Sequence, residues 1–120
     1  MIDAEEFEEL VHSALSHLYD HAYLLRHPLA RSLGSGASAN YRANSLRRLL
    51  LDAIQDLKPP RDAPADAPAG RHYQYLYMRY VESRPVAEIA RGLAVTDRQT
   101  RRRHRDALTA VCRVLRERLR

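Results

Sequence analysis

The sequence predicts an all-α fold, in which a helical N-terminal segment is joined by a proline- and alanine-rich linker to a bundle built around two helices and a tight turn. Apolar residues recur at three- and four-residue spacing in several stretches, as they do along one face of an α-helix. A capping box and several prolines mark where helices begin and end. The chain has 120 residues, 45% of them hydrophobic, which is enough for one or two small helical units.

The first predicted helix runs from residue 7 to about residue 19. Acidic side chains crowd its first turns, where the positive end of the helix dipole favours negative charge. Its apolar face is formed by Phe7, Leu10, Val11, Ala14, Leu15 and Leu18. A helix with one apolar face needs a surface to pack against.

A second helix is predicted to begin between Tyr41 and Ser45 and to be stopped by Pro59-Pro60. Between the two helices, residues 27–30, HPLA, indicate the start of a short helix, and residues 34–39, GSGASA, indicate a flexible loop. The apolar face of the second helix consists of Leu46, Leu49, Leu50, Ala53, Ile54 and Leu57.

Residues 58 to 70, KPPRDAPADAPAG, have the composition of a semi-extended linker. We therefore expect a helical N-terminal region at 1–58, a linker at 59–70 and a C-terminal domain at 71–120. The C-terminal domain is expected to begin with a helix on which Tyr73, Leu76, Tyr77 and Tyr80 share one face. Aromatic side chains near arginines also stack on single-stranded bases, but the shared face favours packing in a core with the tyrosine hydroxyls at its rim.

The next predicted helix covers residues 86–93 and follows Pro85, whose missing N–H has no helical partner to lose at this position. The helix breaks at residues 93–95. Thr96 and Gln99 then form a capping box, so a further helix begins at Thr96 and extends to about Arg118. The apolar face of the shorter helix consists of Val86, Ile89, Ala90 and Leu93.

The helix that begins at Thr96 is predicted to have two different faces. One face is basic and carries Arg98, Arg101, Arg102 and Arg105. The opposite face packs into the core and carries Thr100, His104, Ala107, Leu108, Val111 and Leu115. A solvated basic face on an ordinary helical hairpin has the same pattern, so the pattern alone leaves the use of the arginines open.

Residues 86–108 resemble the helix-turn-helix of region 4 of the sigma-70 family and of the related output domains of bacterial response regulators. The matching residues are Ile89, Ala90, Val95, Thr96 and the pair Ala107-Leu108. The chain departs from the family pattern at Ala94, where the turn usually has glycine, and at Thr100, where the core usually has valine. The resemblance extends over about residues 71–118, and residues 15–57 more loosely resemble a segment that precedes such motifs in some bacterial regulators.

The resemblance implies a bacterial transcriptional regulator, or the DNA-binding module of one, whose last helix enters the major groove of double-stranded DNA. The side chains expected at base edges are Arg98, Gln99, Arg101 and Arg102. Those expected at phosphates are Arg84, Arg91, Thr96, Arg103 and Arg105. The N-terminal helices are expected to form a homodimer, and a sedimentation-equilibrium mass equal to that of the monomer would count against this.

The charge distribution also favours a polyanionic partner. Residues 1–58 have 6 basic and 8 acidic side chains, a net charge of −2, whereas residues 71–120 have 13 and 5, a net charge of +8. Positive charge gathered in one half suits DNA phosphates. A GC-rich genome would explain many arginines, but not the scarcity of acids in this half. The alternative function is an adaptor whose basic helix binds RNA polymerase or an acidic partner protein.

Other site types have weaker support in the sequence. His17 and His21 have a spacing that zinc sites use, but no cysteine or third ligand accompanies them. Ser13 and His17 lack an orienting acid and an oxyanion hole, so we expect neither an enzyme nor a cofactor or metal. Cys112 is expected to be a small buried side chain. The acidic N-terminus and the lack of a long apolar segment predict a cytoplasmic protein that does not enter membranes.

Overall fold

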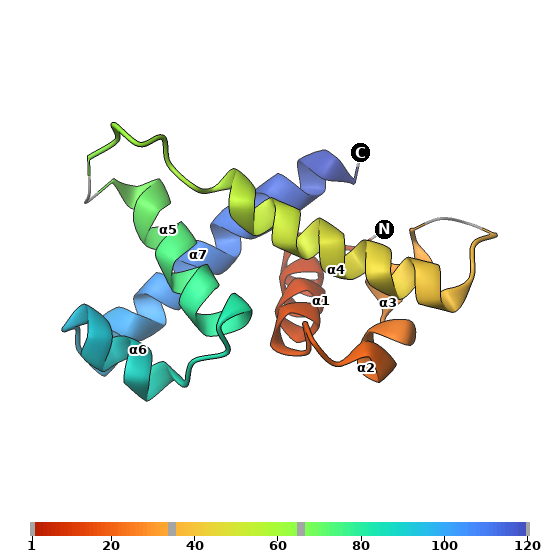
Figure 1. Ribbon diagram of the computed structural model, residues 1–120, viewed down its shortest axis with the longest axis horizontal. Coiled ribbons are helices and arrows are strands. Elements are labelled where there is room, and N and C mark those ends of the chain that lie inside the picture. The colour runs from red at the N-terminus through yellow and green to blue at the C-terminus, as the bar shows by residue number, and fades with distance from the viewer. Residues whose placement is uncertain (1, 34–35, 65–66, 120) are drawn as a thin grey trace. The chain divides into compact units, whose positions relative to one another are not determined.

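Every regular element in the described part of the chain is a helix, as the sequence predicted (Figure 1). The computed structural model describes residues 2–33, 36–64 and 67–119, so the predicted loop at 34–39 lies partly outside the described residues. The chain divides into two compact units, Met1–Asp52 and Ala53–Arg120. The division falls inside helix α4 (Ala39–Asp56), so residues 53–58 belong to the second unit.

The first unit contains α1 (Ala4–Ser16), α2 (His21–Leu25), α3 (Pro28–Arg31) and most of α4. Side chains at the helix starts explain where these helices begin, because the first amides of a helix have no partner within it. The carboxylate of Asp3 accepts a hydrogen bond from the amide of Glu6 at 2.8 Å, and the hydroxyl of Ser38 accepts one from the amide of Tyr41 at 3.1 Å. α1 and α4 therefore both begin a few residues earlier than their apolar stripes predicted.

The core of the first unit comes mainly from the predicted stripes of α1 and α4. Phe7, Leu10 and Leu49 are partly exposed instead, because they lie at the edges of those stripes. Arg47 on α4 ties the unit together by donating from Nε to the carbonyl of Leu18 at 2.8 Å. The buried apolar residues of this unit are Val11, Ala14, Leu15, Leu18, Leu24, Leu29, Ala30, Ala43, Leu46 and Leu50.

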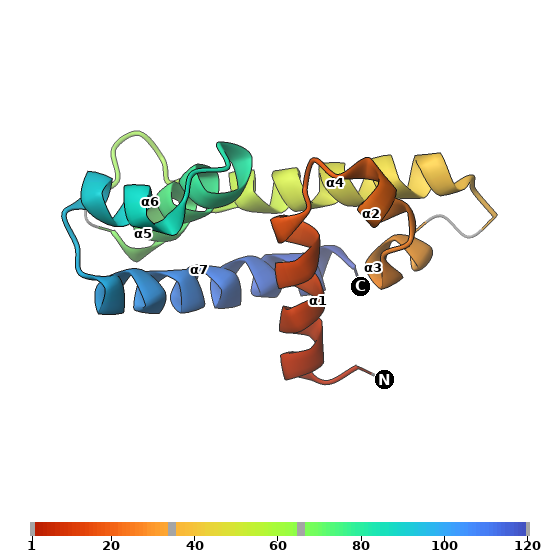
Figure 2. The same ribbon diagram turned by 90° about the horizontal axis from the view of Figure 1, so that it is seen from below.

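The second unit contains the end of α4, followed by α5 (Pro68–Leu76), the π-helix η1 (Tyr77–Val81), α6 (Val86–Leu93) and α7 (Asp97–Arg118). α5 packs mainly on α7, and α6 packs on α7 and η1 (Figures 1 and 2). The last three residues of the predicted linker form the first turn of α5, where Pro68 is tolerated because it needs no amide partner there.

The aromatic residues of α5 and η1 differ from the prediction. Tyr75 and Tyr80 are buried, with 1% and 3% of their surface exposed, whereas Tyr73 and Tyr77 are only partly buried. The cause is η1, in which the amide of Glu82 donates to the carbonyl of Tyr77 five residues earlier. A π-turn contains more residues than an α-turn, so it brings residues five apart closer to one side of the helix than an α-helix does. Tyr75 therefore joins Tyr80 in the core, although the predicted face did not include it, and Tyr73 and Tyr77 are partly buried at the edge of the core.

The core of the second unit confirms most of the packing face predicted for the last helix, of which His104 and Leu108 are partly buried. Thr100, Ala107, Val111 and Leu115 are buried, and Cys112 is buried beside them. The Thr100 hydroxyl donates to the carbonyl of Thr96 at 2.9 Å, so this polar group has a partner in the core. The other buried apolar residues of the unit are Ala53, Ile54, Tyr75, Leu76, Tyr80, Ile89 and Ala90.

Candidate nucleic-acid interface

The predicted break between the last two helices is a Schellman turn at the end of α6. The amide of Val95 donates to the carbonyl of Ala90 at 3.0 Å, and the amide of Ala94 donates to that of Arg91 at 3.2 Å. Ala94 has φ 54° and ψ 44°, the left-handed conformation that usually favours glycine. The turn therefore has the expected geometry although alanine stands at the glycine position.

The capping box at the start of α7 is present with both of its hydrogen bonds. The hydroxyl of Thr96 accepts from the amide of Gln99 at 3.1 Å, and Oε1 of Gln99 accepts from the amide of Thr96 at 2.9 Å. These bonds fix the first turn of α7. The turn and the box together fix the direction in which the next side chains of α7 project.

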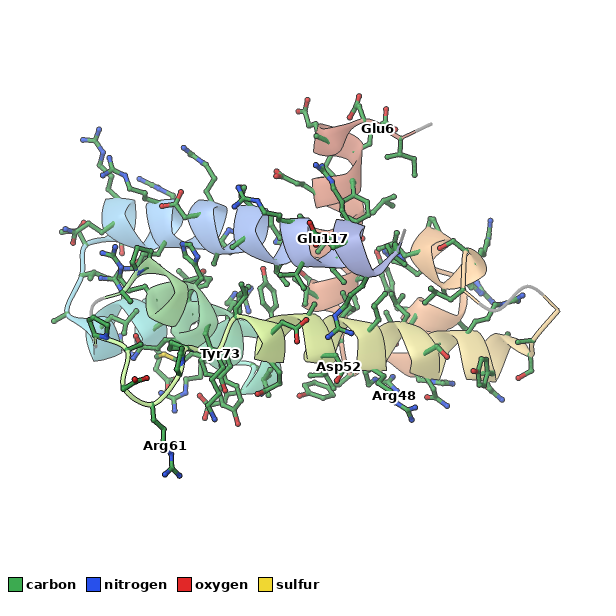
Figure 3. The ribbon with its side chains drawn as sticks, turned by 90° about the horizontal axis from the view of Figure 1, so that it is seen from above. Glu6, Arg48, Asp52, Arg61, Tyr73 and Glu117 are labelled. Carbon is green, nitrogen blue, oxygen red and sulfur yellow. The ribbon has the colours of Figure 1, made fainter. Side chains whose placement is uncertain are left out.

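The four arginines of the predicted basic face, Arg98, Arg101, Arg102 and Arg105, are all exposed. They lie on the side of α7 opposite the buried Thr100 and Ala107, and nitrogen-tipped side chains project outward along this part of the helix (Figure 3). Within the described residues no ion pair involves any of these four arginines. Their charges are therefore available to an anionic partner.

Gln99 is restricted as a base-reading residue. It is exposed, as a groove contact requires, but its Oε1 is engaged by the amide of Thr96. A two-bond contact with adenine needs both the oxygen and the nitrogen of the amide group. While the capping box is closed, one of the two lone pairs of Oε1 is occupied, so the NH₂ group is the freer part of the Gln99 amide. The Thr96 hydroxyl accepts from an amide and retains its proton, which it can donate to a phosphate.

The residues predicted at phosphates are in three different settings. Arg91 and Arg105 are exposed, on α6 and α7 respectively. Arg84 is in the loop before α6, and its Nε lies 3.2 Å from the carboxylate of Glu82, so its charge is already compensated within the chain. Arg103 is partly buried on the flank of α7 that faces α5. Arg91 and Arg105 are thus the most accessible of these arginines.

A basic hollow between α5 and α7 was not predicted from the sequence. The burial of His72 in this hollow is the main reason why its pKa is lowered; the Asp106 carboxylate opposes this effect, and the Arg71 charge adds to it. Two sequence signals could have indicated this hollow. Arg71 and His72 are adjacent basic residues directly after the predicted linker, and the polar residues on α7 have i, i+3, i+4, i+7 spacing. The hollow is lined by Arg71, His72, Gln99, Arg102, Arg103 and Asp106.

Aromatic and histidine side chains hold α7 against the preceding helices. The hydroxyl of Tyr80 and Nε2 of His104 are hydrogen bonded at 2.7 Å, and the rings of Tyr75 and His104 are 5.5 Å apart. Burial raises the pKa values of Tyr75 and Tyr80 above their usual range, so both hydroxyls remain protonated. This contact fixes α7 at His104, which lies within two turns of Arg98, Arg101 and Arg102.

In the first unit, Ser13 is paired with His27 and not with His17. The Ser13 hydroxyl and Nε2 of His27 are 2.8 Å apart, whereas Nδ1 of His17 contacts the backbone carbonyl of Ser13. Nδ1 of His27 accepts from the amide of Leu29 at 3.1 Å, so Nε2 carries the ring proton. His27 therefore has no free lone pair with which to activate Ser13 as a nucleophile.

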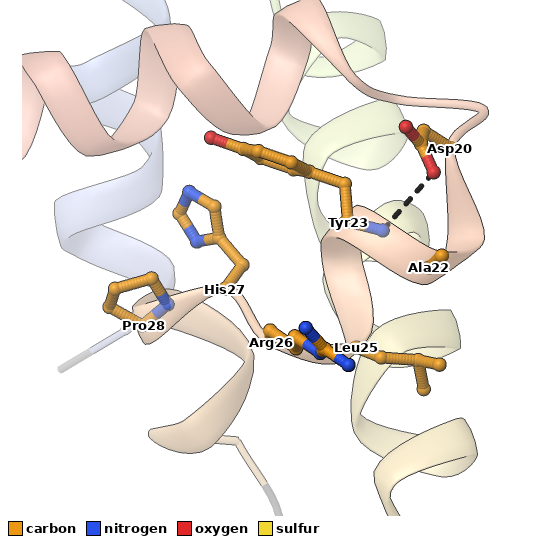
Figure 4. A pocket seen from close by; sticks show the side chains of 7 residues that line it. All are labelled: Asp20, Ala22, Tyr23, Leu25, Arg26, His27 and Pro28. Carbon is orange, nitrogen blue, oxygen red and sulfur yellow. Dashed lines mark hydrogen bonds between the residues drawn. The ribbon is translucent and has the colours of Figure 1, made fainter.

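His27 also forms part of a surface hollow of about 590 Å³, which is shown in Figure 4. The ring of Tyr23 stacks on His17 with 3.7 Å between centroids, and it lies above His27. The Asp20 carboxylate accepts from the amide of Tyr23 at 3.1 Å and caps α2. Helix contacts therefore engage the side chains of Asp20 and His27 in the hollow. The hollow is lined by Asp20, Ala22, Tyr23, Leu25, Arg26, His27 and Pro28.

Across the described residues, no cluster of three or more histidine, cysteine, aspartate or glutamate side chains is arranged to hold a metal ion. None of the helices in those same ranges has both the length and the apolar character needed to span a membrane. No protein family, curated protein or solved structure matches this chain.

Proposed function

We propose that this chain is a sequence-specific DNA-binding transcriptional regulator, or the DNA-binding module of one, and that α7 enters the major groove. The observation that carries the proposal is the exposed arginine face on the first turns of a capped helix, with which no described side chain forms an ion pair. An arginine fork matches O6 and N7 of guanine through two hydrogen bonds. The arginines near the start of α7 are those that a helix in the groove would bring to base edges.

The support for this function is a division of roles between side chains of the second unit. Arg98, Arg101 and Arg102 project from α7 as candidates for base edges, whereas Arg91 and Arg105 are exposed candidates for phosphates. The buried contact of Tyr75 and Tyr80 with His104 holds the helix that carries them. A rigid helix with exposed arginines is what direct reading of base edges requires.

The test is the affinity of the chain for DNA, measured by fluorescence anisotropy at several salt concentrations. A labelled random-sequence duplex tests for binding, and a sequence selected from a random pool tests for specificity. We expect the substitution Arg101→Ala to weaken binding to the selected sequence by about 1–3 kcal/mol and to relax its preference at one base pair. Alanine favours helix, so the variant is expected to fold.

Arg48→Ala is the matched control, because it removes the same charge from an exposed position on α4, in the first unit (Figure 3). We expect it to leave the base preference unchanged. If the unmodified chain fails to bind DNA even at low salt, the DNA-binding function is wrong. The arginine face would then be the docking surface of an adaptor for RNA polymerase or an acidic protein.

A further inference from the structure

The basic hollow between α5 and α7 has a composition suited to one anionic group. Arg71 and His72 project from α5, and Arg102, Arg103 and Asp106 line the side formed by α7. Three guanidinium groups and one imidazole face one carboxylate, so the hollow is positively charged. Its volume of about 340 Å³ leaves room for a phosphate group.

The hollow lies beside the face of α7 that is proposed to read bases, which is the face with Arg98, Arg101, Arg102 and Arg105. Successive residues of an α-helix are rotated by about 100°, which places Gln99 and Asp106 roughly a quarter turn from Arg98 and Arg105. Arg102 lies between the two surfaces and belongs to both. A helix that lies in the major groove has the sugar-phosphate backbone along its flanks. The hollow is therefore on the side of α7 where a DNA strand would pass.

We propose that this hollow binds one phosphate of the DNA backbone and that His72 takes up a proton from solvent when the phosphate enters. The inference rests on the DNA-binding function proposed above and adds to it a specific subsite that includes α5. Arg71 and Arg103 supply guanidinium donors to the phosphate oxygens, and the protonated His72 supplies a further charged donor.

The local charges explain why protonation and binding are coupled. In the free chain, burial lowers the pKa of His72, the Asp106 carboxylate raises it, and Arg71 lowers it further. Arg102 and Arg103 are the other charged groups that line the hollow with it. A phosphate adds negative charge beside the ring and raises its pKa. The bound complex thus holds more protons than the free chain, so DNA affinity must rise as pH falls.

The first test follows DNA affinity with pH, using the random-sequence duplex and the full chain at fixed salt. We expect affinity to increase as pH falls through the range of histidine titration, by up to about tenfold per pH unit for one proton taken up. In the variant His72→Gln, the slope of log affinity against pH should correspond to one proton fewer taken up on binding. At high pH this variant should bind DNA as tightly as the unmodified chain does. His12→Gln, an exposed histidine on α1, is the control and should keep the full dependence. Equal pH profiles for the unmodified chain and His72→Gln would overturn the coupling.

The second test uses salt and does not depend on titration. Each phosphate neutralised adds about 0.9 to the slope of log affinity against log salt. We expect Arg71→Gln to reduce this slope by about one and to weaken binding to all sequences similarly, whereas Arg48→Gln should leave the slope unchanged. If Arg101→Ala impairs binding but Arg71→Gln does not, the DNA-binding function stands and the phosphate subsite is wrong. If the unmodified chain does not bind DNA at all, both proposals are wrong.

Discussion

Each unit of this chain contains a hydrogen bond between a histidine and a hydroxyl, and the two histidines perform different tasks. In the first unit, Ser13 and His27 are 2.8 Å apart, and both ring nitrogens of His27 are used, because Nδ1 also accepts from the amide of Leu29. In the second unit, Tyr80 and His104 are 2.7 Å apart, and the ring of His104 lies beside those of Tyr75 and Tyr80. His27 therefore caps α3 and also connects it to α1, whereas His104 connects two helices and caps neither.

This difference shows how much each unit can depend on a single side chain. α3 has only four residues, too few to be stable without contacts outside the helix, and it is capped by His27, which is buried. α7 has 22 residues and a capping box, so His104 adds one contact to an element that other interactions already hold. Loss of His27 should thus affect its unit more than loss of the Tyr80 hydroxyl affects the other.

The largest expected effect is that of His27→Ala. This change removes the cap of α3 and leaves the Ser13 hydroxyl without its ring partner, at a cost of about 2–3 kcal/mol. His27→Asn should recover about 1 kcal/mol, since asparagine can accept the same amide hydrogen bond. Hydrogen exchange of the amides in α1 to α3 measures both effects. His12→Ala is the control on an exposed face of α1, and equal exchange rates in His12→Ala and His27→Ala would contradict the assigned role.

A smaller effect is expected from the titration of His27, which makes the stability of the first unit depend on pH. Burial is the main cause that lowers the pKa of His27 below its ordinary value of 6.5. The unfolded chain therefore binds a proton at a higher pH than the folded chain does. The titration of this histidine therefore does not change the free energy of unfolding above pH 6.5. That free energy decreases as pH falls below 6.5 and through the pKa of His27 in the folded chain, by at most about 1.4 kcal/mol per pH unit. Urea unfolding at several pH values should show this loss, and His27→Asn should reduce it; an unchanged slope in that variant would refute the assignment.

The smallest effect is expected from Tyr80→Phe. The ring remains in the core, and the hydrogen bond to His104 is lost, which costs about 1 kcal/mol. Hydrogen exchange in α5 and α7 is the measurement, with Tyr41→Phe as a control at an exposed position. If Tyr80→Phe lowers stability more than His27→Ala does, the comparison between the two units is reversed.

Elements with local signals could be predicted from the sequence. Thr96 and Gln99 lie three residues apart and cap each other, so the start of α7 depends on one short segment. The end of α6 at the left-handed Ala94 was found in the same way, because apolar spacing stops there. The exposed arginines follow from these two boundaries, since a fixed helix start fixes the direction of every later side chain.

Features that depend on distant contacts could not be predicted. The burial of Tyr75 requires the π-turn at η1, and no helical stripe in the sequence includes that residue. His27 caps α3 although histidine is not among the usual capping residues, and its pairing with Ser13 joins positions 14 residues apart. The basic hollow needs α5 to lie against α7, which brings Arg71 and His72 to Arg103 and Asp106.

Ala94 also bears on how far this domain could evolve. A left-handed alanine costs about 1 kcal/mol or more, and the cost falls on the folded state alone. Proteins have only a small excess of stability, and most substitutions use part of it. A glycine at residue 94 would relieve the strain without altering any exposed arginine of α7. The chain could then accept more substitutions on that helix and still fold, which would widen the set of recognition surfaces that mutation can reach from this sequence.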